Sequence, residues 1–360
     1  MKKLKVAIIG QGRSGRDIHG AYFKSEANVK YNVIAVVDAI ESRRVRAQKE
    51  YPAADVYSDY KELFGRNDID LVINSTFSHQ HAEISIDLLN HGFNVVCEKP
   101  FAKTYEDGCR IVNAAEANGK MVNVFQQSRF APYYVKMKEI LASGILGPVI
   151  DVHATFGGFA RRWDWQTSLD HAAGNVRNTG PHPLDHALDL FGFCDDITVF
   201  SKIACYNDFG DAEDYAKIIL TAPGKHLSEI TISSYNGYSQ PTYVVSCKNG
   251  CLKTNMHEIE IKYFNPETAP LHKHTVTPIE NEDGTPAYCS ETLEWKTESF
   301  NIEGDAFDKA VDSYYSMIYD YLVNDKEMLI NPYQVLKQLK VIDLIHAQNP
   351  LAIKPDLRKN

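Results

Sequence analysis

The chain has 360 residues, of which 44% are hydrophobic and 24% charged, and its formal net charge is −9. This length and composition indicate a globular protein of two domains, and the dispersed acidic excess argues against nucleic acid or an anionic membrane as a partner. No apolar run is long enough to span a membrane or to act as a secretory signal, and the seven cysteines include no CxxC pair. These features favour a reducing cytoplasm.

The first third of the chain alternates short β-branched runs with helical stretches. Strands and helices that alternate at this spacing are typical of βαβ units and predict an α/β domain with a parallel sheet over residues 1–125. The expected strands are Val6–Ile9, Val33–Val37, Leu71–Ile73, Val95–Cys97 and Met121–Phe125, and the expected helices are Ser14–Lys24, Glu41–Tyr51, Tyr60–Phe64, Ala82–Asn90 and Tyr105–Asn118.

The texture changes after about residue 126, which predicts a second, α+β domain over residues 126–360. The alternating, turn-punctuated pattern of its middle part is typical of an antiparallel sheet with one covered face. The expected elements are a helix at Tyr133–Ser143, a strand at Val149–Phe156, a helix near Leu184–Leu190, an antiparallel sheet over Thr198–Tyr263, a polar loop at Glu280–Asp305, and helices at Asp305–Val323 and Tyr333–Asn349.

A G-x-G-x-x-G pattern follows the first expected strand directly and opens a helix. Gly10 would permit the tight turn, Gly12 would let the backbone approach a pyrophosphate, and Gly15 would let the helix pack on the strand. The pattern therefore predicts a Rossmann dinucleotide site that includes the intervening Arg13 and Ser14. The alternative is a glycine-rich turn that binds no ligand.

Asp38 ends the second expected strand, about 20 residues after the glycine motif. A carboxylate at this place accepts hydrogen bonds from the ribose hydroxyls of the adenosine and repels a 2′-phosphate, so it favours NAD over NADP. Arg43 and Arg44 lie close enough in sequence to keep NADP open as a cofactor.

Glu98-Lys99-Pro100 ends the strand Val95–Cys97, at the carboxyl edge of the sheet where ligands of such folds bind. A lysine at a strand end is usually a solvated charge. Lys99 is flanked by a glutamate and by a proline that could form a cis peptide bond, which indicates that the protein holds the lysine side chain in a defined position.

Taken together, the motifs resemble the glucose–fructose oxidoreductase and inositol dehydrogenase (Gfo/Idh/MocA) family over nearly the whole chain. Family members have a Rossmann domain followed by an α+β domain with a large, mostly antiparallel sheet, which binds the substrate and often mediates oligomerisation, so a homodimer or homotetramer is expected. The likeness rests on the glycine motif, Thr76 to His81, Glu98-Lys99-Pro100, Arg129-Phe130, the turn Ser143 to Gly147, and Gly180-Pro181-His182-Pro183-Leu184-Asp185.

The resemblance implies a dehydrogenase that oxidises a secondary alcohol of a sugar, sugar derivative or cyclitol, or that runs the reverse reduction. In that role Lys99 would hydrogen-bond the reacting hydroxyl and His182 would accept its proton. Such chemistry needs a proton acceptor of near-neutral pKa and a cation beside the developing alkoxide. The resemblance also assigns contacts with the cofactor to Thr76, His81, Glu98, Lys99 and Gln127.

Asn178 stands where the family commonly has an aspartate, four residues before His182. An amide can orient a hydroxyl or the histidine but cannot accept a proton at neutral pH, so His182 is the only obvious base. Two other functions therefore stay open: a glycoside-cleaving enzyme that recycles a bound NAD, and a non-enzymatic sensor that binds the dinucleotide. His182 could also be a structural histidine that caps a helix.

The segment Arg161-Arg162-Trp163-Asp164-Trp165 lies in the loop after the first strand of the second domain and faces the expected cleft. Aromatic planes beside charged groups suit a sugar ring, which predicts substrate contacts; a surface loop that packs on its own or a neighbouring subunit is the alternative.

His182 and His186 have the i, i+4 spacing of a metal pair, but Pro183 replaces the glutamate of H-E-x-x-H, and no metal is expected.

Overall fold

The computed structural model describes residues 2–304 and 306–350. Met1, Asp305 and residues 351–360 belong to the predicted domains, and Asp305 also begins a predicted helix, but these residues lie outside the described ones. Within the described ranges, no helix is long and apolar enough to cross a membrane.

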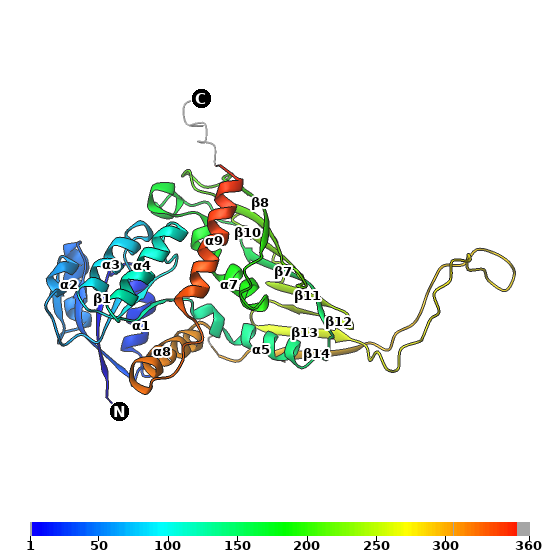
Figure 1. Cartoon of the computed structure of the whole chain (residues 1–360), viewed down its shortest axis with the longest axis horizontal. Coiled ribbons are helices and arrows are strands. Elements are labelled where there is room, and N and C mark those ends of the chain that lie inside the picture. Colours follow the sequence, from blue (N-terminus) through cyan, green and yellow to red (C-terminus); the bar gives the residue numbers. More distant parts are fainter. Residues whose placement is uncertain (1, 305, 351–360) are drawn as a thin grey trace, which may run out of the picture.

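Sheet A is the predicted parallel sheet, and it lies in the N-terminal part of the chain (Figure 1). Its six strands follow the order β3-β2-β1-β4-β5-β6, and every neighbouring pair is parallel. The predicted strands are confirmed, whereas the edge strand β3 was missed because its three residues, Asp-Val-Tyr, include no buried residue and only one β-branched side chain. The strands are β1 Leu4–Ile9, β2 Tyr31–Val37, β3 Asp55–Tyr57, β4 Leu71–Asn74, β5 Val95–Cys97 and β6 Val122–Val124.

The helices that connect these strands cover both faces of sheet A. The predicted helix Ser14–Lys24 is two pieces: a π-helix over Arg13–His19, closed by a bond from Gly20 N–H to the carbonyl of Gly15, and the short helix α1. The other elements of this region are α1 Gly20–Lys24, α2 Glu41–Glu50, α3 His81–Asn90, α4 Tyr105–Ala117 and the 3₁₀ turns Tyr60–Leu63, Ser78–Gln80 and Gln127–Phe130.

Sheet B is the predicted larger sheet, with the order β14-β13-β12-β11-β7-β10-β9-β8. It is antiparallel except for the parallel pair β7 and β10. Alternate residues of its strands are buried, so one face is covered. Its strands are β7 Val149–Gly157, β8 Thr198–Ala204, β9 Tyr215–Thr221, β10 Leu227–Ser233, β11 Tyr243–Cys247, β12 Gly250–Thr254, β13 Glu258–Tyr263 and β14 Lys296–Asn301.

Three helices pack against sheet B: α5 (Pro132–Ala142), α7 (Pro181–Leu190) and α9 (Pro332–Gln348). Figure 1 shows α9 running between the two sheets, where it contacts α4, α7 and β8. The short helix α6 (Asn175–Asn178) comes just before α7 and contacts β9 and β10.

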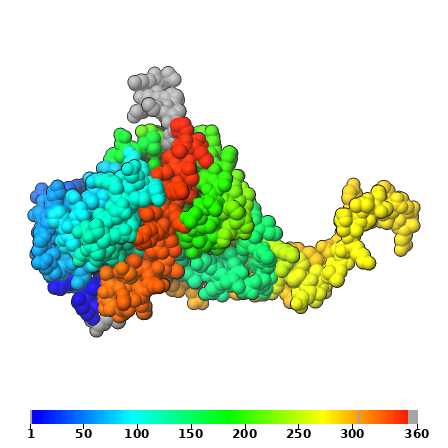
Figure 2. Space-filling model, viewed as in Figure 1, coloured from blue at the N-terminus to red at the C-terminus, as the bar shows by residue number. Residues whose placement is uncertain are grey.

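The polar segment Glu280–Asp305 is only partly the predicted loop. Its residues Lys296–Asn301 form β14, an edge strand whose charged, mostly exposed side chains hid the strand pattern in the sequence. Between β13 and β14, residues 264–295 form an arm that projects away from the body of the molecule (Figures 1 and 2). Leu271 and Tyr288 on this arm are 98% and 94% exposed.

Helix α8 (Ala306–Asn324) packs against sheet A, although it follows sheet B in sequence. Tyr314 and Tyr315 are fully buried there, and the hydroxyl of Tyr31 donates to the carbonyl of Tyr315 at 2.6 Å. Both C-terminal helices therefore contact the N-terminal part of the chain: α8 packs on sheet A and α9 packs on α4.

We predict that Gly108→Ala destabilises the protein by disturbing the contact between α4 and α9. A β-carbon at Gly108 would lie 2.6 Å from Leu339 Cδ1 and 2.8 Å from Leu336 Cδ2. Such overpacking costs about 1–3 kcal/mol, which exceeds the gain of about 1 kcal/mol that alanine brings to a helix. Urea unfolding checks this, with Gly158→Ala as the control because its β-carbon meets no atom within 4 Å. A stabilised Gly108→Ala variant would contradict the contact.

Candidate active site

A cavity of about 710 Å³ opens at the carboxyl edge of sheet A, facing α6 and the start of α7. Its volume is typical of a ligand site. Gly15, Arg161 and Trp163 do not line it. The predicted site residues that do are Gly10, Gly12, Arg13, Ser14, Asp38, Thr76, His81, Glu98, Lys99, Gln127, Arg162, Asn178 and His182.

The glycine turn has the geometry that its pattern predicts. Gly10 has a φ of +89°, and a β-carbon there would lie 2.4 Å from the carbonyl oxygen of Ser75. A β-carbon at Gly15 would lie 1.8 Å from the carbonyl of Gly10, so the helix packs directly on the strand end. At Gly12 the nearest atom would be Arg43 Nη1 at 3.7 Å, which leaves the backbone open to the cavity. This cradle fits a pyrophosphate.

Asp38 is buried at the end of β2 and lines the same cavity. Its Oδ2 accepts a hydrogen bond from Gln11 N at 2.7 Å and lies 3.4 Å from Arg43 Nη1, while its Oδ1 accepts from Ile40 N at 2.8 Å. A carboxylate offers about four acceptor positions, so Asp38 keeps capacity for a ribose hydroxyl.

Glu98 lines the cavity, but both of its carboxylate oxygens already have protein partners. Oε1 lies 3.1 Å from His19 Nε2, whose other ring nitrogen lies 2.7 Å from the hydroxyl of Tyr315, and Oε2 accepts from Lys99 N at 3.0 Å. Burial opposes ionisation, but the hydrogen bond and charge of His19, together with the charges of Lys99 and His81, outweigh it and lower the pKa of Glu98 to about 2. Glu98 therefore holds the backbone of Lys99 in place.

The further predicted cofactor residues Thr76, His81 and Gln127 lie around the same opening. His81 is buried with its ring between the carbonyl oxygens of Pro100 and Thr76, at 2.7 and 3.2 Å, so it ties the two loops together. Gln127 is buried, and among the described residues its Oε1 has no hydrogen-bond partner. An unpartnered buried acceptor on the cavity wall suits a ligand that donates a hydrogen bond.

Lys99 and Asn178 meet across the cavity. Lys99 Nζ donates to the backbone carbonyl of Asn178 at 2.8 Å and lies 3.5 Å from its Oδ1, which also lies 3.4 Å from Gln166 Nε2. Burial lowers the pKa of the Lys99 ammonium, and the guanidinium groups of Arg13 and Arg162 act in the same direction. The peptide bond that precedes Pro100 is cis.

His182 is the second residue of α7 and lines the cavity beside Lys99. The helix begins without a side-chain cap, so His182 is not the capping histidine that the sequence left open. Its Nδ1 is buried with no partner among the described residues. Burial, with the nearby Lys99 charge as the next cause, lowers the pKa of His182 to about 3, so the imidazole is neutral at pH 7 and can accept a proton.

His186 points away from this site into the core. Its ring nitrogens lie 2.7 Å from the hydroxyl of Tyr243 and 3.0 Å from the carbonyl of Ser128, and the ring stacks on Tyr134. The pair with His182 therefore does not converge. In the part of the chain that the structure describes, no group of three or more metal-ligating side chains could hold a metal ion.

The loop after β7 brings part of the predicted segment 161–165 to the cavity. Arg162 lines it, held by Asp164 Oδ1 at 3.1 Å and Oδ2 at 2.6 Å and by Gln166. Arg161 lies over the ring of Phe209, and Trp163 is 81% exposed.

Two aromatic residues line the cavity together with Arg162: Trp165, which belongs to the segment predicted to contact the substrate, and Phe77, which was not predicted as a site residue. Trp165 packs edge to face against Phe77 with ring centroids 5.0 Å apart. The Arg-Trp-Asp-Trp run pointed to this loop, but it gave no signal for which tryptophan faces inward. Phe77 follows Thr76 in a loop whose pattern carries no period.

Two family models match the chain. The model of an oxidoreductase family with an NAD-binding Rossmann fold matches residues 4–126, and the GFO/IDH/MocA C-terminal domain matches residues 134–253, so together they cover more than half of the chain. The chain belongs to the Gfo/Idh/MocA family. It is an oxidoreductase whose N-terminal domain is an NAD-binding Rossmann domain, as the glycine motif predicted.

Relatives support this membership in the Gfo/Idh/MocA family. Oxidoreductase C115.03 of Schizosaccharomyces pombe is 28% identical over 284 residues, 76% of this chain and 74% of that protein. Oxidoreductase YdgJ of Escherichia coli is 25% identical over 352 residues, 95% and 94% of the two chains. Inositol 2-dehydrogenase of Salmonella typhimurium is 34% identical over 152 residues, which span 42% of this chain and 45% of that enzyme.

Solved structures share the Gfo/Idh/MocA fold of this chain. An NAD-binding protein from Listeria innocua has a TM-score of 0.78 at 22% identity and covers 96% of this chain and 97% of its own. An oxidoreductase from Agrobacterium radiobacter, in complex with NAD⁺, L-tartaric acid and magnesium, has a TM-score of 0.74 at 18% identity and covers 96% of both chains. At these identities the likeness is one of fold.

We predict that mild acid destabilises the protein through its buried histidines. Burial lowers the pKa of His186 from 6.5 to about 3. Below pH 6.5 the unfolded chain binds a proton there that the folded chain refuses until about pH 3, so the free energy of unfolding falls as the pH falls through this window. His186 alone should cost about 2 kcal/mol between pH 6.5 and pH 5.

Urea unfolding at pH 7, 6 and 5 measures this loss. Carboxylates with lowered pKa values act at lower pH, so the histidine window is separate from theirs. An unfolding free energy that stays level between pH 7 and pH 5 would contradict the assignment of neutral, buried histidines.

Proposed function

We propose that this oxidoreductase uses NAD to oxidise a secondary alcohol of a sugar, sugar derivative or cyclitol, or runs the reverse reduction. The observation that carries the proposal is that Lys99 and His182 line the same cavity as the glycine turn. A cation and a neutral imidazole therefore stand at one end of a dinucleotide cradle. Alcohol oxidation needs this combination of groups.

The chain's own residues fit the cofactor along the whole cavity. The open backbone at Gly12 would hold the pyrophosphate and Asp38 the adenosine ribose, while Gln127 offers its free acceptor further along the wall. When bound, the nicotinamide supplies a two-electron acceptor for hydride. Asp38 also favours NAD over NADP, because a second negative charge beside it would be repelled.

At the reacting end, His182 accepts the proton of the substrate hydroxyl. It is neutral at pH 7, and its Nδ1 has no competing partner among the described residues. Lys99 has three N–H donors. At most two of them are directed at the carbonyl and the amide oxygen of Asn178, so at least one is available for the alkoxide that develops. Asn178 thus positions the lysine rather than accepting a proton.

The substrate end of the cavity combines polar groups with an aromatic wall. Arg162 with its partners Asp164 and Gln166 supplies donors and acceptors, and Trp165 supplies a flat apolar surface. This combination suits the hydroxyls and the C–H face of a polyol ring. The relatives named inositol 2-dehydrogenase support cyclitols as the first compounds to test.

Turnover of a sugar and cyclitol panel with NAD and NADP tests this function through the absorbance of the reduced cofactor. We expect steady NADH production with at least one alcohol. Lys99→Met should lower kcat by about 100-fold or more, because it removes the donor to the alkoxide, and should change the NAD dissociation constant only slightly. Equal losses in kcat and in the affinity for NAD would indicate that Lys99 only anchors the cofactor. Product without net NADH would indicate the cofactor-recycling hydrolase instead.

Asn178→Asp tests whether the amide serves this reaction. A carboxylate at Asn178 would pair with the Lys99 ammonium, now 3.5 Å from Oδ1, and hold it more tightly. We therefore expect kcat to fall several-fold and the kcat–pH profile to shift to higher pH. A strongly raised kcat would instead mean that a carboxylate at this position takes part in the reaction and that Asn178 has lost this role.

A further inference from the structure

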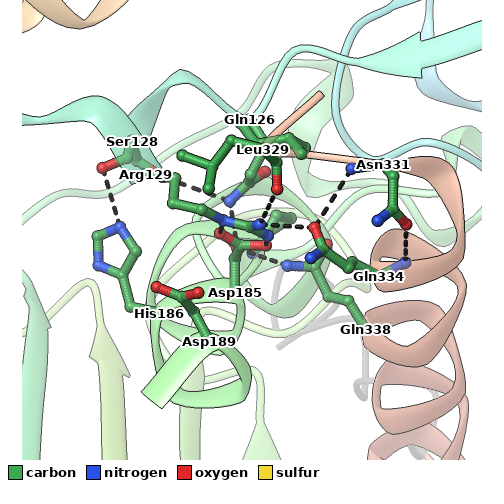
Figure 3. A network of polar contacts seen from close by, with 12 residues as sticks. Gln126, Ser128, Arg129, Asp185, His186, Asp189, Leu329, Asn331, Gln334 and Gln338 are labelled. Atoms are coloured by element: carbon green, nitrogen blue, oxygen red, sulfur yellow. Dashed lines mark hydrogen bonds and ion pairs between the residues drawn. The ribbon is translucent and has the colours of Figure 1, made fainter. Parts of the chain in front are cut away.

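The N-terminal turn of α7, which carries His182, is held by a buried polar network that includes the C-terminal helix α9 (Figure 3). The carbonyl of Pro181, the residue before His182, accepts a hydrogen bond from Gln126 Nε2 at 2.7 Å and another from Gln338 Nε2 at 2.7 Å. Gln126 and Gln338 are 1% and 3% exposed. Gln338 lies 157 positions from Pro181 in sequence.

One turn further along α7, Asp185 is paired with Arg129, and both side chains are fully buried. Arg129 Nε donates to Asp185 Oδ2 at 2.8 Å and Nη2 contacts Oδ1, while Nη1 donates to the side chain of Gln334 at 2.6 Å and to the carbonyl of Leu329 at 3.2 Å. The pair thus joins α7 to α9 and to the segment that leads into it, on the same side as Gln338.

Few other contacts fix the place of His182, although its backbone N–H donates to the carbonyl of Thr179 at 3.1 Å. No partner among the described residues holds its Nδ1, and Asn178 directs its amide oxygen to Lys99 and Gln166. The position of the imidazole therefore depends on the backbone of the first turn of α7. That backbone is anchored at the carbonyl immediately before His182.

We propose that Gln338 is a positioning residue for His182: its bond to the Pro181 carbonyl sets where the base stands in the cavity. This inference rests on the proposed role of His182 as base. It makes α9 part of the frame of the active site. A misplacement of about 1 Å at such a distance can cost about 100-fold in rate, so the effect is measurable.

Gln338→Met keeps the length of the side chain and removes the donor. The matched control is Gln348→Met, because Gln348 lies on the same helix and donates to a backbone carbonyl, that of Val199, at the same 2.7 Å but away from α7. The first readout is the imidazole signal of His182 in nitrogen-15 NMR spectra of histidine-labelled protein, assigned by its loss in His182→Asn. This readout needs no substrate.

We expect Gln338→Met to shift the His182 signal and, with an alcohol that turns over, to lower kcat by about 10- to 100-fold while KM and NAD affinity hold. Gln348→Met should leave the His182 signal, kcat, KM and NAD affinity unchanged. An unmoved His182 signal in folded Gln338→Met, or equal shifts in both variants, would overturn the proposal. If Gln338→Met does not fold, Gln126→Met, which removes the other donor to the same carbonyl, is judged by the same criteria.

The two readouts separate this inference from the proposed function. A shifted signal without turnover of any alcohol would leave the positioning of His182 intact and reject the dehydrogenase. Turnover of an alcohol, with an unmoved His182 signal and an unchanged kcat in Gln338→Met, would reject the positioning role of Gln338 and support the dehydrogenase.

Discussion

The hydrogen bond from Lys99 Nζ to the backbone carbonyl of Asn178 is the contact on which the reacting centre depends. It is 2.8 Å long and joins the carboxyl edge of sheet A to the short helix before α7. One partner stands beside the glycine turn and the other four residues before His182. This contact therefore joins the proposed cofactor residues to the turn that carries His182, and both line one cavity.

Burial sets the chemistry of that cavity. Partial removal of the Lys99 ammonium from water is unfavourable, and the Asn178 carbonyl and the charge of Glu98 offset part of this cost. The same burial keeps His182 neutral. The pKa of about 3 is well below the near-neutral value expected from the sequence. In the proposed reaction His182 would thus be a weaker base than its type suggests, and stabilisation of the alkoxide by Lys99 would have to supply more of the driving force.

Behind the cavity, buried polar side chains lie within the apolar core that sheet A and sheet B share. Glu98 fixes the backbone of Lys99, and the Arg129–Asp185 pair fixes α7 (Figure 3). Breaking a buried pair by removing one member costs about 3–5 kcal/mol, because the remaining charge is left buried without a partner. The C-terminal helices take part in these contacts. Tyr315 on α8 contacts His19, the partner of Glu98, and Gln334 on α9 accepts a hydrogen bond from Arg129.

Local patterns in the sequence were sufficient for the parts of the fold and site that depend on neighbouring residues. The glycine turn, Asp38 at a strand end and Lys99 beside a proline each follow from chemistry within a few positions. The alternating burial of β9 to β13 likewise follows from a period of two.

Features that depend on the path of the chain could not be predicted in this way. An amphipathic pattern at α8 indicates a helix, but it does not say that the helix covers sheet A. Nothing local distinguishes Trp165, which lines the cavity, from Trp163, which is exposed. The partners of Pro181 come from positions 126 and 338, and no spacing rule connects them.

The central claim is that the alcohol reacts between Lys99 and His182. A crystal structure of the protein with NADH and an alcohol that it turns over tests this most directly. The account predicts one hydroxyl oxygen within about 2.6–3.2 Å of both Lys99 Nζ and the His182 imidazole, with the C–H of the same carbon directed at the nicotinamide. An alcohol bound with its carbon near the nicotinamide but its hydroxyl against other side chains would contradict it.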